Sequence, residues 1–291
     1  MSSDHRARRR VNRGAARPLR LRIAALLAVL ATGCASGART PFTLRERAPL
    51  RFTAEQMAVL GAEARREMLD RQELVGSNEL RARVSRVAGR LVDVVPTEAR
   101  RPERWRFRIL DTPETVNAMA LPDGSVLVFS GLLDVATEDG LLAAALAHEM
   151  AHVLLEHANE RIGRPKWKAA FDRPVQLVLG VWRTLAPGTR RFVLDSLGFG
   201  RILKGFTPYS QEHENEADLV GLHLMYRAGF TLTDAPRLWE RLETLRESPD
   251  ADGLCTHPDP EDRARRLRRI ITETRGIPAR ALPDPEGTGR P

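Results

Sequence analysis

Apolar residues recur along this chain with two different periods, and each period predicts its own kind of element. From 105 to 110 apolar and polar side chains alternate, as in a half-buried strand, and short apolar runs follow at 116–121 and 125–130. Elsewhere, apolar spacing and helix-end signals predict helices over 53–75, 79–95, 137–163, 207–229, 234–247 and 260–275. We therefore predict an α+β fold that is mainly helical and contains one small sheet.

The residues between these segments support the predicted boundaries. Thr53 followed by Gln56 three residues later is a capping box, which opens a helix. Pro122-Asp123-Gly124 predicts a tight turn between two strands, because proline fixes φ and glycine tolerates positive φ. The organisation that follows is a signal peptide over 1–33, a tether over 34–52, a folded domain over 53–275 and a disordered tail over 276–291.

The first 33 residues have the composition of an export signal. Residues 1–22 hold eight arginines and one acidic residue, Asp4, and nine apolar residues follow. Thr32-Gly33-Cys34 then resembles the end of a bacterial lipoprotein signal, in which the cysteine is lipidated. We expect a lipid anchor on Cys34 and a periplasmic protein held at the inner leaflet of the outer membrane, which Ala35 favours. The alternative is a plain cleavable signal with a chance cysteine.

Charge and cysteine content exclude other classes of protein. Of the net charge of +8, the leader's arginines supply seven after Asp4 is subtracted, so the rest of the chain is almost neutral. A nearly neutral domain lacks the basic surface that nucleic-acid binding needs, so we expect no nucleic-acid partner. Two cysteines exclude a disulfide-stapled scaffold, and no apolar run is long enough to predict a transmembrane helix.

The segment that carries chemistry is His148-Glu149-Met150-Ala151-His152, in the middle of the predicted helix 137–163. Positions i and i+4 share one helix face, so His148 and His152 can bind one Zn²⁺ together. Glu149 then lies beside the metal and can accept a proton from its water. The flanking residues are apolar, and burying these polar groups without partners would cost roughly several kcal/mol. The metal site is therefore favoured over two core histidines.

A catalytic zinc needs a third protein ligand and an open fourth position. Glu212, Glu214 and Glu216 compete for that role in one predicted helix. Only Glu214 has an aspartate four residues later, Asp218, whose carboxylate can accept the far N–H of a ligating imidazole. We predict Glu214 as the ligand and Asp218 as that acceptor, with Glu212 and Glu216 facing solvent. Glu216 and His213 stay open as alternative ligands.

Taken together, these pieces resemble the HtpX / CAAX-prenyl-protease family of zinc metallopeptidases, of the gluzincin type. The matching segments are 117–124, 131–133, 148–153, Glu214 to Gly221, and Thr256-His257-Pro258 with Arg263. Because no transmembrane helix is expected, the chain is more similar to the soluble periplasmic lipoproteins of the LoiP and BepA type. The resemblance implies a zincin-like domain with its small sheet beside the helix that carries the two histidines.

What the resemblance implies for function is a zinc endopeptidase that hydrolyses misfolded or assembling envelope proteins, with Glu149 as the base. The alternative is a chaperone-like or scaffold lipoprotein with little proteolysis. His257 either approaches the zinc, as an oxyanion stabiliser or a plug, or only caps the last helix. The strand 125–130 either pairs with an extended substrate or is an ordinary buried strand. Residues 164–206 form a lid or, as we favour, two amphipathic helices on the core.

Overall fold

The structure is a computed structural model that describes residues 50, 52–70, 72–95, 105–163, 209–246 and 260–274. The predicted signal peptide, most of the tether and the tail lie outside these ranges, and so do Cys34, His257 and the segment 164–206. Their predicted roles stay predictions.

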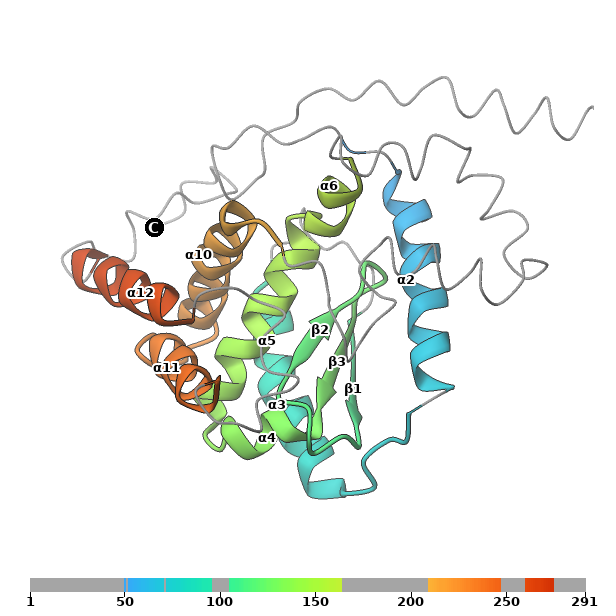
Figure 1. Cartoon of the computed structure of the whole chain (residues 1–291), viewed down its shortest axis with the longest axis horizontal. Coiled ribbons are helices and arrows are strands. Elements are labelled where there is room, and N and C mark those ends of the chain that lie inside the picture. Colours follow the sequence, from blue (N-terminus) through green and yellow to red (C-terminus); the bar gives the residue numbers. More distant parts are fainter. Residues whose placement is uncertain are drawn as a thin grey trace, which may run out of the picture. The chain divides into compact units, whose positions relative to one another are not determined.

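The described elements confirm an α+β fold that is mainly helical (Figure 1). The strands are β1 (Arg106–Leu110), β2 (Ala118–Ala120) and β3 (Ser125–Phe129). The helices are α2 (Ala54–Leu69), α3 (Asn78–Asp93), α4 (Ser130–Val135), α5 (Asp139–Leu154), α6 (His157–Gly163), α10 (Gln211–Arg227), α11 (Asp234–Arg246) and α12 (Pro260–Thr274). Helices therefore surround a single small sheet in the described part of the chain.

Side-chain caps set where two of these helices begin. The Thr53 hydroxyl accepts a hydrogen bond from the Gln56 N–H at 3.3 Å, and the Gln56 side chain accepts one from the Thr53 N–H at 2.9 Å. This is the predicted capping box of α2, although α2 ends at Leu69 rather than near 75. The Ser210 side chain caps α10, so that helix begins at Gln211, later than predicted.

The predicted helix 137–163 is two helices, α5 and α6, separated by a sharp break. Glu156 adopts a φ of 55°, in the left-handed region, and a right-handed helix cannot continue through that conformation. α5 therefore ends at Leu154, and α6 starts again at His157 in a new direction. Nothing in the hydrophobic period of the sequence indicated this break, and it decides where His157 points.

The sheet has the order β1-β3-β2, with β1 parallel and β2 antiparallel to β3. Gly124, with a φ of 81°, closes the predicted turn between β2 and β3. Because β3 pairs on both sides and all five of its residues are buried, its main chain has no edge to offer to a substrate. The predicted pairing of substrate with 125–130 is therefore wrong, and the alternative of a buried strand holds.

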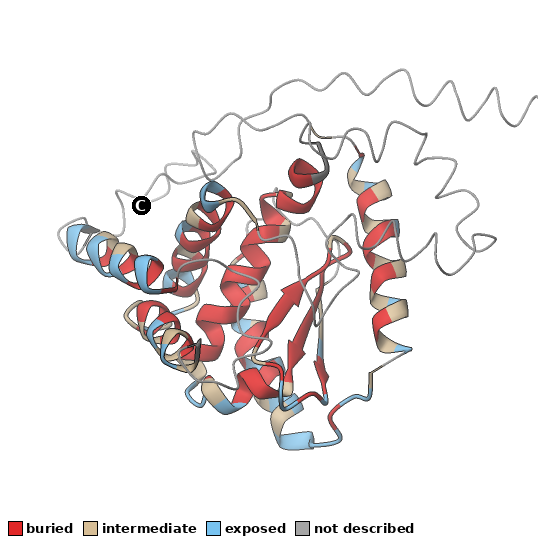
Figure 2. Cartoon of the chain, viewed as in Figure 1, coloured by how far each residue is buried: buried red, intermediate tan, exposed pale blue. Residues whose placement is uncertain are grey.

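Helix α5 lies at the centre of the core and is buried on nearly all sides (Figure 2). It packs against α3, α10, α11 and β2. A Cβ added to Gly221 would lie 3.3 Å from the backbone nitrogen of His148, so α10 approaches the α5 backbone closely at this point. That contact holds the acidic segment of α10 next to the histidines of α5. None of the described helices is long and apolar enough to cross a membrane.

Candidate metal centre

His148 and His152 lie one turn apart on α5 and face the same side of it. Both are nearly inaccessible to solvent, at 3% and 2% exposure. Their Nε2 atoms are 3.0 Å apart, so both lone pairs can point to one position. The i, i+4 spacing therefore produces the convergence that the sequence predicted.

Glu214 completes this group from the first turn of α10. Its Oε2 lies 3.2 Å from His148 Nε2, and its Oε1 lies 3.7 Å from His152 Nε2. The ligand atoms of His148, His152 and Glu214 all lie within 4.8 Å of one another, and all three residues are buried. Two imidazoles and one carboxylate are a donor set that catalytic zinc uses, so these residues fit that ion.

Asp218 and Arg263 lie behind this group. Asp218 Oδ1 is 3.1 Å from His148 Nδ1, while Glu214 lies against the other ring nitrogen, Nε2. The Asp218 carboxylate can therefore accept a hydrogen bond from an N–H at His148 Nδ1. The guanidinium of Arg263, from α12, lies 2.5 Å from Asp218 Oδ1, 3.0 Å from Glu214 and 3.0 Å from His148 Nδ1, and it stacks 3.4 Å over the Trp239 ring. Burial alone would raise the pKa of Asp218, but Arg263 and His148 outweigh burial and hold that pKa well below its usual range.

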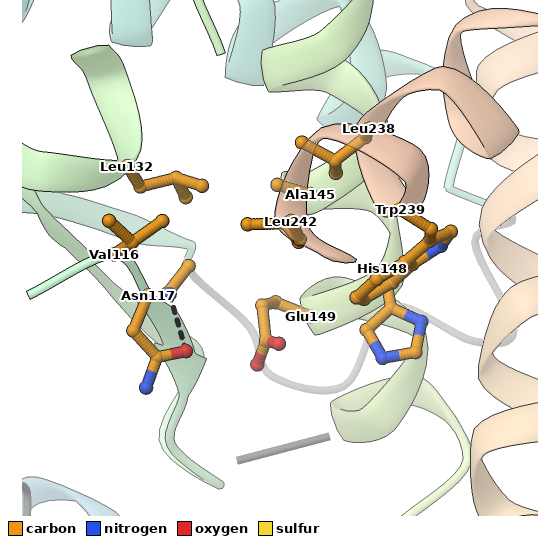
Figure 3. A pocket seen from close by; sticks show the side chains of 10 residues that line it. Val116, Asn117, Leu132, Ala145, His148, Glu149, Leu238, Trp239 and Leu242 are labelled. Carbon is orange, nitrogen blue, oxygen red and sulfur yellow. Dashed lines mark hydrogen bonds between the residues drawn. The ribbon is translucent and has the colours of Figure 1, made fainter. Parts of the chain in front are cut away.

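Glu149 lies on the sheet side of α5, between the histidines and β2. Its Oε2 accepts a hydrogen bond from the Ala120 N–H at 2.9 Å, which fixes the carboxylate against the edge strand. Figure 3 shows Glu149 and His148 at the rim of a pocket. The other lining residues are almost all apolar and come from four parts of the chain: Val116, Asn117, Ala118, Leu132, Ala145, Leu238, Trp239 and Leu242.

A second buried polar group, which we call the outer cluster, lies beside His152. It consists of His157, Glu160, His213 and Glu216, and all four are buried. His157 Nε2 lies 3.2 Å from Glu216 Oε2, and His213 Nε2 lies 3.0 Å from Glu160 Oε2. The two imidazoles stack with their centroids 4.4 Å apart. Each histidine of the outer cluster thus has its own carboxylate.

The outer cluster corrects one expectation about α10. Glu216 does not face solvent as predicted but is only 6% exposed, because α6 covers that side of α10 and places His157 against it. Glu212 is exposed. His213 and Glu216 do not join the three converging donors, so the structure places neither among the ligand atoms. Burial lowers the pKa of His157 to about 4, against the opposing effect of Glu216, so this imidazole is neutral at pH 7.

Two features of the site were not assigned from the sequence. Arg263 was quoted only as part of a matching segment, although its link to Asp218 spans 45 residues of chain. The outer cluster was missed because the helical period carried α5 through Glu156 and turned His157 away from the site. The spacing of five residues between His152 and His157 fits a second helix with a new phase, and this spacing could have indicated that His157 returns to the site.

Proteins of known function with similar sequences share this region of the chain. The mitochondrial metalloendopeptidase OMA1 of Schizosaccharomyces pombe is 33% identical over 193 residues, which are 65% of this chain and 52% of that protein. OMA1 of Bos taurus is 31% identical over 204 residues, 62% of this chain and 36% of the relative. The beta-barrel assembly-enhancing protease of Escherichia coli is 26% identical over 195 residues, 62% and 37%. The chain thus spans about half or less of the length of these relatives.

These names overturn the predicted location. We expected a periplasmic protein at the outer membrane, but the OMA1 relatives are named as mitochondrial, and they match with higher identity than the beta-barrel assembly-enhancing protease does. That prediction rested on the leader, on Ala35 and on the resemblance to periplasmic lipoproteins, and residues 1–33 lie outside the described ranges. The prediction of a periplasmic, outer-membrane location is therefore wrong by this comparison.

The family itself is as predicted. Residues 78–271, two thirds of the chain, match the profile of a family described as peptidase family M48. The match begins with α3 and ends within α12, so it contains the sheet, both helices of the metal centre and Arg263. The prediction of a metallopeptidase is confirmed at the level of the family, while the names of the relatives do not single out the branch of periplasmic lipoproteins. The chain belongs to peptidase family M48.

Proposed function

We propose that this protein is a zinc-dependent endopeptidase that hydrolyses peptide bonds of protein substrates. His148, His152 and Glu214 hold the zinc. The observation that carries the proposal is the convergence of these three donors inside the core, with a carboxylate, Glu149, fixed beside them. The relatives named as metalloendopeptidases support the same activity.

Zinc in such a site supplies Lewis acidity, which polarises a carbonyl and lowers the pKa of a water to about 7. The chain's own residues do the remaining work. Glu149 accepts the proton of the attacking water and delivers it to the leaving amine. The Ala120 N–H keeps the Glu149 carboxylate on the sheet side of α5. Asp218 accepts from His148 Nδ1, so that His148 Nε2 is the nitrogen left for the metal.

The pocket beside Glu149 sets the kind of substrate. Its walls are apolar, with Leu132, Leu238 and Leu242 among them, and its polar rim is formed by His148 and Glu149. A side chain next to the scissile bond would enter this pocket, and apolar walls reward an apolar side chain. We propose cleavage next to apolar residues, which unfolded segments expose and folded proteins bury. The activity belongs to the domain over 53–275.

Zinc-dependent cleavage of an unfolded protein tests this function. Full-length wild type should cleave the substrate, chelator should abolish cleavage, and zinc should restore it. Glu149→Gln removes the base but no ligand, so it should lower the rate by roughly 10²–10⁴-fold and keep one zinc per chain. A variant that binds zinc and cleaves as fast as wild type would show that Glu149 is not the base. If wild type binds zinc and the unfolded protein but does not cleave that protein, the result would favour the scaffold function instead.

A further inference from the structure

A line of two contacts leads from a carboxylate of α10 to one of the metal-binding imidazoles. Glu216 Oε2 lies 3.2 Å from His157 Nε2. His157 Nδ1 lies 2.9 Å from His152 Nδ1. The other ring nitrogen of His152, Nε2, is the one that faces His148 and Glu214. Each of the two imidazoles therefore faces one neighbour with Nδ1 and another with Nε2, and Glu216, His157 and His152 are all buried.

The protons on this line can be placed in only one way if His152 binds the metal. A ligating imidazole uses the lone pair of Nε2, so the remaining proton sits on Nδ1 and must be donated. The atom that it meets is His157 Nδ1, which must then be the acceptor. An imidazole that accepts at Nδ1 carries its proton on Nε2, so His157 donates that proton to Glu216. The carboxylate at the end accepts it.

We propose that Glu216 and His157 are positioning residues for the metal centre, forming a relay that fixes the tautomer and the ring orientation of His152. The proposal rests on the metal site proposed above. The Tyr209 ring stacks on His152 at a centroid distance of 4.1 Å and holds its plane, while His157 sets which nitrogen carries the proton. His148 has the corresponding acceptor in Asp218, so both ligating imidazoles lead to a carboxylate of α10.

The break at Glu156 is what makes the relay possible. Five residues after His152, a continuous helix would carry His157 away from the ligand face. Because Glu156 is in the left-handed region, α6 begins with a new phase, and the His157 ring lies against the His152 ring. The relay thereby ties α6 and α10, which meet through Glu216, to a ligand on α5.

The same two helices contain a matched pair that does not lie on this line. His213 and Glu160 are equally buried, and their contact is 3.0 Å against 3.2 Å for His157 and Glu216. His213 stacks on His157, and its Nε2 faces Glu160 rather than a histidine of α5. If buried His–Glu pairs only stabilise the fold, changes in either pair should act alike. If the relay exists, only one pair should act on zinc.

The test compares zinc affinity of full-length variants by competition with a chromogenic chelator. Glu216→Gln should weaken zinc binding about tenfold and His157→Phe by up to about 100-fold. Glu160→Gln should leave zinc binding within about twofold of wild type. His157→Asn should recover part of the loss, because its Oδ1 can take the place of Nδ1 as acceptor. Equal zinc affinities for Glu216→Gln and Glu160→Gln would overturn the relay.

A second measurement reads the protons directly. ¹⁵N NMR of the zinc-loaded protein with labelled histidine should show His157 protonated on Nε2 and His152 protonated on Nδ1. The opposite tautomer of His157 would overturn the proposal even if its variants bind zinc poorly through partial unfolding. Wild type that binds no zinc would instead refute the metal site, and the relay with it, whereas wild-type binding with unaffected variants refutes the relay alone.

Discussion

Two buried clusters of histidine and carboxylate share helix α10 and differ in how their atoms converge. In the inner cluster, His148, His152 and Glu214 direct three donor atoms into one space less than 4.8 Å across. In the outer cluster, each imidazole faces its own carboxylate, at 3.2 and 3.0 Å. Composition and burial are nearly the same, so these properties do not distinguish a metal site from a structural pair.

The difference shows that a set of metal ligands is recognised by donor atoms that converge on one position. Paired His and Glu satisfy each other inside the protein, which makes their burial tolerable. Three converging donors satisfy one another only if an imidazole keeps its proton on Nε2 and donates it to Glu214, and a metal ion would take the place of that proton. The inner cluster also has Arg263 as a neighbouring positive group, 3.0 Å from Glu214 and 3.0 Å from His148 Nδ1.

The largest expected effect separates the clusters by metal content. Glu214→Ala removes one of three converging donors, and the purified protein should retain no zinc after dialysis, as measured by atomic absorption. Glu160→Ala removes a carboxylate of equal burial from the outer cluster and should retain one zinc per chain. Retained zinc in Glu214→Ala, or lost zinc in a folded Glu160→Ala protein, would reverse the assignment of the two clusters.

Arg263 provides the next effect, on the free energy of unfolding. Arg263→Met removes the guanidinium beside buried Glu214 and leaves Asp218 with that of Arg266, which should cost about 3–5 kcal/mol in the metal-free protein. Urea unfolding measures it. Zinc should recover part of the loss, because it supplies positive charge to Glu214.

The matched control lies on the same helix. Arg268 pairs with Glu240, but both side chains are about half exposed, so Arg268→Met should cost less than about 1 kcal/mol. Similar losses for Arg263→Met and Arg268→Met would mean that the inner cluster does not depend on a compensating cation. The comparison thus tests burial of charge rather than the removal of an arginine as such.

The part of the site that follows from a helical period could be predicted from the sequence. His148 with His152 and Glu214 with Asp218 are i, i+4 pairs, and within one helix that spacing determines which side chains share a face. The three strands were likewise visible as short apolar runs around the turn at Pro122. Periodicity therefore placed the residues that act within a single element.

What depends on contacts between distant segments could not be predicted in this way. Arg263 reaches Asp218 only because α12 packs on α11, whose Trp239 supports its guanidinium. Glu216 is buried only because α6 turns at Glu156, and that turn depends on the φ of one residue. The alternative that β3 pairs with a substrate does not hold, because β1, which precedes β3 in the chain, pairs with its other edge.

The smallest effect uses the one described histidine that belongs to neither cluster, His223 on α10. Burial, together with the nearby Arg227, lowers the pKa of His223 below its usual value. Below pH 6.5 the unfolded chain then takes up a proton that the folded protein refuses, so stability should fall as pH falls. His223→Gln removes this group and should lose less stability than wild type between pH 7.5 and 5.5, in thermal unfolding of zinc-loaded protein. Parallel curves for the two proteins would mean that acid acts on the fold through the clustered histidines and carboxylates rather than through an isolated, half-buried imidazole.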